Sequence, residues 1–196
     1  MGKKSLWPAI LVILCICTQS AYACTAATFG LEWDSSIDTK NFTVNIYAPY
    51  FATNVTNCGY NWNGISSQVN VSNVYSYDAN TDPYTQDISI FQKDLSGTTI
   101  GRTYFYKKGI FGWTEVGTTS SGIKLSRIAL DSALLNDSDA FIEKVITHEL
   151  GHAFGLCHPI EVNCTAYAVM QQSSTNYWAY TIQPHDRNNL IAKWGN

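Results

Sequence analysis

The pattern of apolar and polar positions changes its period once along the chain. Upstream of residue 131, short stretches alternate apolar and polar side chains or are rich in β-branched residues, as β-strands are. We expect strands over residues 43–47, 67–77, 87–92, 101–106 and 124–130. The stretch 67–77 fits a hairpin equally well. Residues 109–122 are rich in Gly, Ser and Thr and predict a loop. Residues 48–62 favour a helix only weakly, because Pro49 and Gly59 interrupt them.

Beyond residue 137 the apolar positions recur at steps of three and four, which is the period of a helix. They are Phe141, Ile142, Val145, Ile146 and Leu150. Ser138 and Asp139 offer a cap and an acidic first turn, and Gly155 can end the helix in a left-handed conformation. A last helix is expected to begin near residues 184–186 and to run through Leu190 and Trp194. Strands followed by helices predict an α+β fold.

The first residues read as an export signal. Lys3 and Lys4 precede an apolar run over residues 9–17, and Ala21-Tyr22-Ala23 has the small-x-small pattern that a signal peptidase recognises. The run is shorter than the roughly 20 apolar residues that span a bilayer. We therefore predict a secretory signal peptide over 1–23, a single catalytic domain over 24–196, and no transmembrane segment in the mature chain.

Cleavage near Ala23 would leave Cys24 as the first residue of a secreted protein. A cell-surface lipoprotein anchored through Cys24 remains an alternative, although Ala21 stands where such signals usually carry Leu. Export implies an oxidising compartment. Four of the six cysteines lie beyond residue 23, and they allow three pairings. We favour Cys157–Cys164 with Cys24–Cys58.

Composition excludes several classes of protein. The 196 residues are 45% hydrophobic and 14% charged, enough to form a core, which argues against intrinsic disorder. The formal net charge of −3 argues against nucleic acid as a partner, because binding phosphates needs a positive surface. We expect a monomer.

Three of the four histidines lie within residues 148–158. His148 and His152 are four residues apart, so a helix places both on one face. Gly155 permits a turn that brings His158 back toward them. Three histidines with one open position are a typical catalytic zinc site. Glu149, beside the first ligand, is the expected general base toward the water in the open position.

This stretch resembles the metzincin zinc endopeptidases, whose pattern is H-E-x-x-H-x-x-G-x-x-H followed by a Met-turn. Ala168-Val169-Met170 looks like that turn. Within the metzincins the chain is most similar to a compact, matrixin-like catalytic domain. The resemblance implies a metzincin-like zincin fold: a twisted mixed β-sheet, a long zinc-binding active-site helix and a C-terminal helix. Pro159 follows the third histidine, where matrixins usually carry Ser, so the subfamily stays open.

The predicted function is that of a secreted zinc-dependent metalloendopeptidase. It would hydrolyse peptide bonds of a protein or peptide substrate with a zinc-activated water, Glu149 acting as base. The substrate would lie extended along an exposed sheet edge that residues 109–122 could border, and the segment after Met170 would line a side-chain pocket. Two alternatives remain: a secreted binding or adhesion module with a structural zinc site, and a zinc hydrolase of non-peptide amides. A structural calcium ion is also left open by four scattered aspartates: Asp78, Asp82, Asp87 and Asp94.

Overall fold

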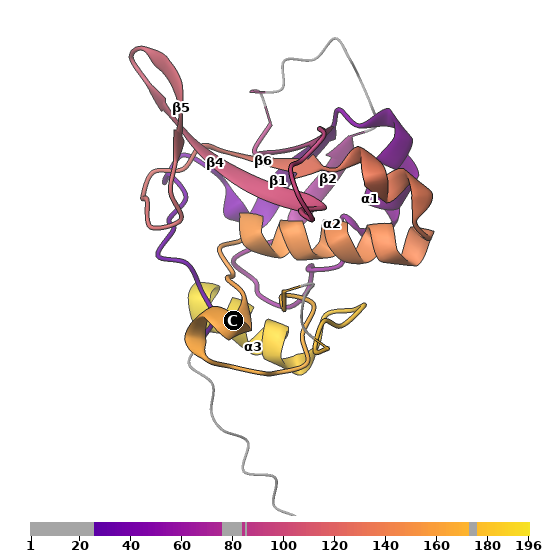
Figure 1. Ribbon diagram of the computed structural model, residues 1–196. Helices are drawn as coiled ribbons and strands as arrows, with labels where there is room; N and C mark the ends of the chain where they lie inside the picture. The colour runs from indigo at the N-terminus through magenta and orange to yellow at the C-terminus, as the bar shows by residue number, and fades with distance from the viewer. Residues whose placement is uncertain (1–25, 76–83, 85, 173–175) are drawn as a thin grey trace, which may run out of the picture.

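The computed structural model describes residues 26–75, 84, 86–172 and 176–196 (Figure 1), so the predicted signal peptide lies outside them. The strands are β1 (Phe42–Ile46), β2 (Val71–Tyr75), β3 (Ile88–Gln92), β4 (Gly101–Gly109), β5 (Gly112–Val116) and β6 (Leu125–Leu130). The α-helices are α1 (Ala52–Cys58), α2 (Asp139–Ala153) and α3 (Pro184–Trp194). The 3-10 helices are η1 (Thr39–Asn41), η2 (Pro49–Phe51), η3 (Ser132–Asn136) and η4 (Pro159–Val162).

The six strands form one mixed sheet in the order β2-β1-β3-β6-β4-β5. β1 pairs in parallel with both β2 and β3, and β3 pairs in parallel with β6. β4 runs antiparallel to β6, and β5 runs antiparallel to β4. The central strands β3 and β6 are largely buried, as strands covered on both faces are. Because it contains both parallel and antiparallel pairs, the sheet is mixed, as expected.

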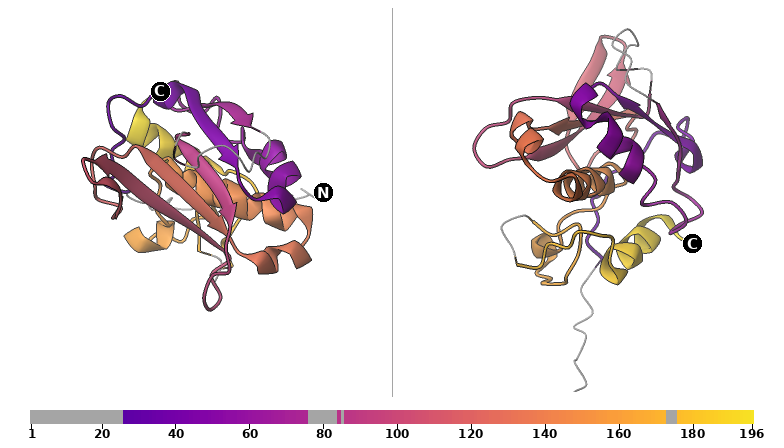
Figure 2. Two further views of the ribbon diagram at one scale, coloured as in Figure 1. Left: turned by 90° about the horizontal axis from the view of Figure 1, so that it is seen from above. Right: turned by 90° about the vertical axis from the view of Figure 1, so that its right-hand side faces the viewer.

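α2 lies along one face of the sheet, and α3 packs below α2 on the side away from the sheet (Figures 1 and 2). α2 begins where predicted, since the Ser138 side chain accepts a hydrogen bond from the Phe141 N–H. Most of the apolar stripe of α2 lies inside the core: Val145, Ile146 and Leu150 are at most 1% exposed, and Phe141 is partly buried. None of the described helices has both the length and the apolar character needed to cross a membrane.

The predicted loop over 109–122 is wrong in part, because Gly112–Val116 form β5. The turn is tight, and Gly112 takes a φ of +107°, which a residue without a Cβ accepts readily. The strand then gains its backbone hydrogen bonds from β4, in a register that pairs Lys108 with Trp113. Pairing with a neighbour, rather than local composition, makes this segment a strand.

The region 48–62 resolves into two short helices. Pro49 is the first residue of η2, because the fixed φ of proline suits a first helical position. α1 follows directly. Gly59 follows α1 as its C-cap residue. Both residues that weakened the prediction thus lie at helix boundaries.

Neither predicted disulfide forms. Cys58 and Cys157 are free and buried, whereas Cys164 is disulfide-bonded. Cys58 lies on α1 beside Thr147 of α2, and burial raises the pKa of its thiol to about 12. η4 and the left-handed Asn163 carry the chain to a position where Cys164 Sγ is 3.8 Å from His185 Nε2. Spacing in the sequence did not reveal this path, and Cys24 lies outside the described residues.

Candidate metal centre

The end of α2 and the turn that follows it position the three histidines. His148 and His152 lie one helical turn apart near the end of α2. The chain leaves the helix through Gly155, which has a φ of +87°. A Cβ at this glycine would overlap the Lys193 side chain of α3, so a larger residue would have to displace that side chain as well as adopt a strained backbone conformation. His158 then follows as the N-cap residue of η4.

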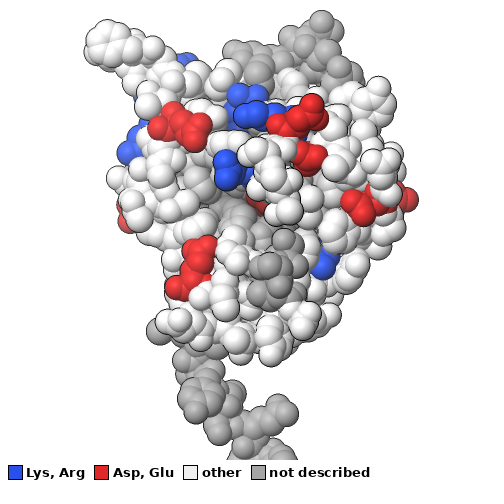
Figure 3. Space-filling view, viewed as in Figure 1, with Lys and Arg blue, Asp and Glu red and all other residues white. Residues whose placement is uncertain are grey.

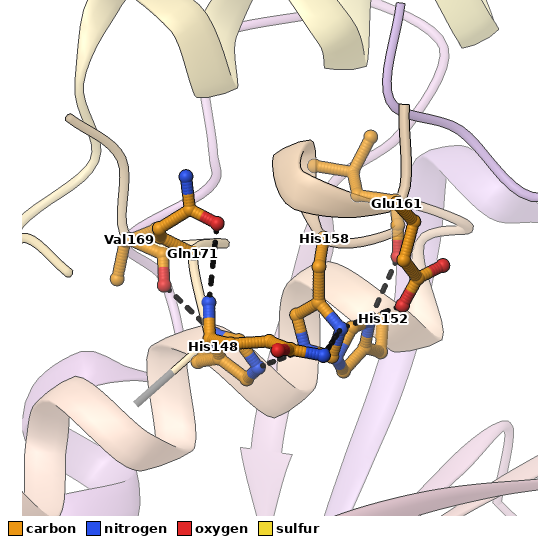
Figure 4. Close-up of polar contacts among 8 residues, drawn as sticks. His148, His152, His158, Glu161, Val169 and Gln171 are labelled. Carbon is orange, nitrogen blue, oxygen red and sulfur yellow. Dashed lines mark hydrogen bonds and ion pairs between the residues drawn. The ribbon is translucent and has the colours of Figure 1, made fainter. Parts of the chain in front are cut away.

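The three imidazoles point toward one another (Figure 4). His158 Nε2 lies 3.2 Å from His148 Nε2 and 3.2 Å from His152 Nε2. Each Nδ1 faces an acceptor instead: Val169 O at 2.7 Å, Leu156 O at 2.8 Å and Glu161 Oε1 at 2.7 Å, in the order of the histidines. The Nδ1 atoms must therefore carry the protons, which leaves three Nε2 lone pairs directed at one point.

This arrangement fits a zinc ion. Tetrahedral coordination with Zn–N bonds of 2.0–2.1 Å requires nitrogens about 3.3 Å apart, close to the observed spacing. Burial lowers the pKa of His148 to about 3, and that of His152 well below its usual value, so both rings are neutral as ligands must be. Three converging lone pairs with no proton between them repel unless a cation lies among them. Among the described residues, this trio forms the one group of three or more side chains that could hold a metal ion.

The segment 168–170, compared with a Met-turn in the sequence, packs against α2 behind the histidines. Met170 is fully buried, and a Cβ at Gly151 of α2 would overlap its sulfur. The turn is tied to α3 by Asp186, whose carboxylate accepts the N–H groups of Val169 at 2.9 Å and Met170 at 3.2 Å. Because Val169 O also accepts the His148 proton, this buried carboxylate helps to place the first histidine.

Glu149 is buried beside the trio and faces β4. Its side chain is 5% exposed, and Oε2 accepts a hydrogen bond of 2.6 Å from the Thr103 hydroxyl. Burial raises the pKa of this carboxyl to about 7, against the lowering effect of the Thr103 hydrogen bond. A Cβ at Gly101 would lie 2.7 Å from Glu149 Oε1, so only glycine leaves the carboxylate this position. A carboxyl with a pKa near 7 can exchange protons in either direction at neutral pH.

The histidines and Glu149 line an open cleft of about 500 Å³. Residues of β4 form its upper wall, and Val145, Gln172 and Trp178 border the site from α2 and from the segment after Met170. Part of the predicted pocket segment, 173–175, lies outside the described residues, and Tyr177 does not line the cleft. In Figure 3 this face is hollowed near its centre, with both basic and acidic side chains around the hollow.

The free edge of the sheet at the cleft belongs to β4, not to residues 109–122. The N–H groups of Lys124 and Asp131 bond to Tyr106 O and Ile100 O, so the even-numbered carbonyls of this strand face β6. Alternation directs the backbone groups of Gly101 and Thr103 to the opposite edge. β5 covers that edge only from Phe105 onward. Of the stretch 109–122, only Thr118 reaches the cleft.

Glu161, Thr103 and Asp186 were missed by sequence reasoning. Glu161 follows His158 by three residues, a spacing that could have suggested contact. Thr103 and Asp186 are far from the histidines in sequence, and only the packing of β4 and α3 against α2 brings them near. His185 lies outside the trio, half-buried beside Cys164.

The calcium site left open by the sequence is not supported. The Asp87 carboxylate accepts hydrogen bonds from the Thr43 N–H and hydroxyl, and Asp94 accepts one from Ser132. Asp78 and Asp82 lie outside the described residues. The two described aspartates thus act as local hydrogen-bond acceptors.

Replacing Glu161 with Gln is expected to weaken zinc binding by about 10- to 100-fold, because partners of ligating histidines contribute in this range. The amide keeps an oxygen that accepts the hydrogen bond from His158 Nδ1–H. It removes the negative charge that makes the Nε2 atom of this ring a stronger ligand for the metal. Competition with a fluorescent chelator measures the affinity. Glu143→Gln, on the same helix as His148 but outside the cleft, is the matched control. Equal affinities for the two variants would contradict this role.

Comparison with known proteins supports a metallopeptidase. Residues 109–165 match the model of a family described as dual-action HEIGH metallo-peptidases. The match contains all three histidines, and the five letters of that name align with His148–His152 except that Leu150 stands in place of Ile. No curated protein matches the chain.

Two solved structures share the fold at low sequence identity. The crystal structure of myroilysin has a TM-score of 0.50 and 13% identity, over 84% of this chain and 86% of that chain. The ECX AB5 holotoxin in its GM1-bound form gives a TM-score of 0.51 and 12% identity, over 83% of this chain and 84% of that chain. The architecture is consistent with a compact zincin-like peptidase domain, and the family match together with the histidine trio supports a zinc metallopeptidase.

Proposed function

We propose that this protein is a secreted zinc endopeptidase of the metzincin type, with His148, His152 and His158 as ligands and Glu149 as general base. One observation carries the proposal: three converging Nε2 atoms and a buried carboxylate lie in the same open cleft. A structural zinc site would have no use for an open cleft or for a carboxylate beside it.

The chemistry divides between the metal and the chain. When bound, zinc lowers the pKa of a coordinated water toward 7 and polarises a carbonyl oxygen. Glu149 would accept a proton from the attacking water and later deliver it to the nitrogen of the departing amine. The Thr103 hydroxyl would hold the carboxylate during both transfers.

An extended peptide suits the shape of the cleft. The edge groups of Gly101 and Thr103 can pair with a substrate strand, as exposed sheet edges do in peptide recognition. Val145 and Trp178 would then flank the side chain that follows the cleaved bond. Trp178 is held in place because its Nε1–H donates to Val169 O at 2.8 Å.

Two further observations support the metzincin assignment and the secretion of the protein. The buried Met170 under the histidines supports the metzincin assignment and a matrixin-like arrangement, while Pro159 leaves the subfamily undecided. The charged start, apolar run and small-x-small site over residues 1–23 support secretion. Mass analysis of protein collected from a secreting host tests this: a first residue of Cys24 is expected, and retention of residues 1–23 would contradict it.

Hydrolysis of unfolded casein or gelatin, with and without a strong zinc chelator, tests the activity. We expect cleavage that the chelator stops and that added zinc restores. Cleavage unaffected by the chelator would refute the proposed reaction. Turnover of small amides without cleavage of a peptide library would instead identify a hydrolase of non-peptide amides.

Thr103→Val is expected to lower kcat about tenfold with little change in KM. The valine keeps the shape of threonine but cannot donate to Glu149, so the carboxylate loses the bond that orients it. Thr103→Ser retains the hydroxyl and should restore most of kcat. Steady-state kinetics on a fluorogenic peptide measure both. A serine variant as slow as the valine variant would show that packing, not the hydroxyl, matters here.

A further inference from the structure

The turn between β4 and β5 projects from the body of the protein with two apolar side chains at its tip. Ile110 is 92% exposed and Phe111 is 99% exposed. Figure 1 shows this hairpin as a finger extending beyond the rest of the sheet, and in Figure 3 its outermost end is the white projection at the upper left. Among the described residues, the next most exposed large aliphatic or Phe side chain is Leu135, at 42%.

Folding does not require these two side chains. Gly109 and Gly112 flank the turn, and Gly112 takes the positive φ that the reversal demands. The tip residues themselves have negative φ values, so polar residues common in turns would fit equally well. Full exposure of an Ile–Phe pair instead keeps apolar surface in water, which is unfavourable unless something covers it.

Cationic and aromatic groups lie directly behind the tip. Lys107 and Lys108 are adjacent in β4, so their side chains leave opposite faces of the hairpin. Lys108 Nζ lies 5.5 Å from the centre of the Trp113 ring across the strand pair. The paired part of the hairpin, residues 105–116, carries two lysines and one acidic residue, Glu115, in a chain whose formal net charge is −3. Glu115 points toward the Tyr106 hydroxyl, at 3.5 Å, and lies further from the tip.

We propose that this hairpin tip inserts into the surface of an anionic phospholipid bilayer. The order of groups along the finger matches the layers of a membrane: Ile110 and Phe111 reach the acyl region, Trp113 lies at the interface, and Lys107 and Lys108 face lipid phosphates. A narrow convex tip with two apolar side chains suits insertion. It offers far less area than the roughly 800 Å² per partner that a stable protein interface buries.

Docking through the tip leaves the cleft accessible. The cleft lies at the start of β4, and the eight steps from Gly101 to Gly109 span about 26 Å. Membrane binding and hydrolysis are therefore separable, and the proposal does not depend on the peptidase activity. Each can be tested, and can fail, without the other.

Vesicle sedimentation provides the test. The protein is purified from the medium of a secreting host, and its mass is checked so that the apolar run over residues 9–17 is absent. Vesicles contain phosphatidylcholine alone or with one quarter phosphatidylserine. Ile110→Ser/Phe111→Ser removes the apolar tip, and Lys107→Gln/Lys108→Gln removes the charges. Tyr50→Ser, at a 73% exposed tyrosine outside the hairpin, is the matched control.

We expect the wild-type protein to sediment with the phosphatidylserine vesicles and only weakly with the neutral ones. The tip variant should lose at least about tenfold in partitioning, and the lysine variant roughly fivefold per charge on anionic vesicles only. The Tyr50 variant should bind as wild type. Unchanged melting temperatures and circular dichroism show that the variants remain folded. No binding at millimolar phosphatidylserine lipid, or equal binding by the tip variant, would overturn the proposal and leave the tip to a protein partner or to none.

Discussion

Glu149→Gln is expected to lower kcat for peptide hydrolysis by roughly 10³-fold while zinc remains bound. The amide has nearly the same shape and can still accept from Thr103, so the side chain stays in place. It cannot take a proton from water at neutral pH, and general-base catalysis contributes about 10²- to 10⁴-fold. The three ligands are untouched, so one zinc per chain should still be found by elemental analysis.

Glu143→Gln is the matched control for this change. Glu143 lies on α2 but does not line the cleft, and its carboxylate accepts a hydrogen bond from the exposed Asn57. Its kcat should stay within about twofold of wild type. Near-normal hydrolysis by the Glu149 variant would show that another group activates the water, and loss of zinc from it would show that Glu149 supports the metal site instead.

Removing one ligand through His158→Ala is expected to abolish both tight zinc binding and hydrolysis. The two histidines left on α2 cannot complete a three-ligand site. Loss of a residue that only hydrogen-bonds to a ligand lowers metal affinity by up to about 100-fold. Loss of the ligand itself should lower the zinc affinity further. Zinc at a thousand times its dissociation constant stabilises the folded state by about 4 kcal/mol, so saturating zinc should raise the melting temperature of wild type but not of the variant.

His185→Ala serves as control for this experiment, because His185 is the histidine outside the trio. It should bind zinc and hydrolyse peptides as the wild-type protein does. A zinc-dependent shift in melting temperature that persists in the His158 variant would place the metal elsewhere. Calorimetry and titration with a competing chelator measure the two quantities independently.

Local patterns predicted the elements that bury apolar side chains in a regular period. The helical step of Val145, Ile146 and Leu150 located α2, and its cap at Ser138 is where the sequence suggested. The strands β1, β3, β4 and β6 also lie close to their predicted ranges. These elements share strong periodicity, which is the part of the fold that neighbouring residues determine.

Contacts between distant residues account for what the sequence analysis missed. β5 has the composition of a loop and becomes a strand only by pairing with β4. Cys157 and Cys164 are close in the chain, yet η4 separates their paths. Thr103 approaches Glu149 because β4 packs on α2, and the distance of 46 residues between them hides the pair. Each case depends on which surfaces meet in the folded protein.

The sequence by itself determined the helical face that carries His148 and His152, the glycine that turns the chain, and the residue types that zinc chemistry needs. Helix period and backbone conformation are local properties, so a short segment suffices to specify them. Only the tertiary structure decided that His158 meets the other two at 3.2 Å, that Glu149 is held by β4, and that Asp186 anchors the turn under the site. Those distances depend on how sheet, helix and C-terminal segment pack, which no single stretch of the chain encodes.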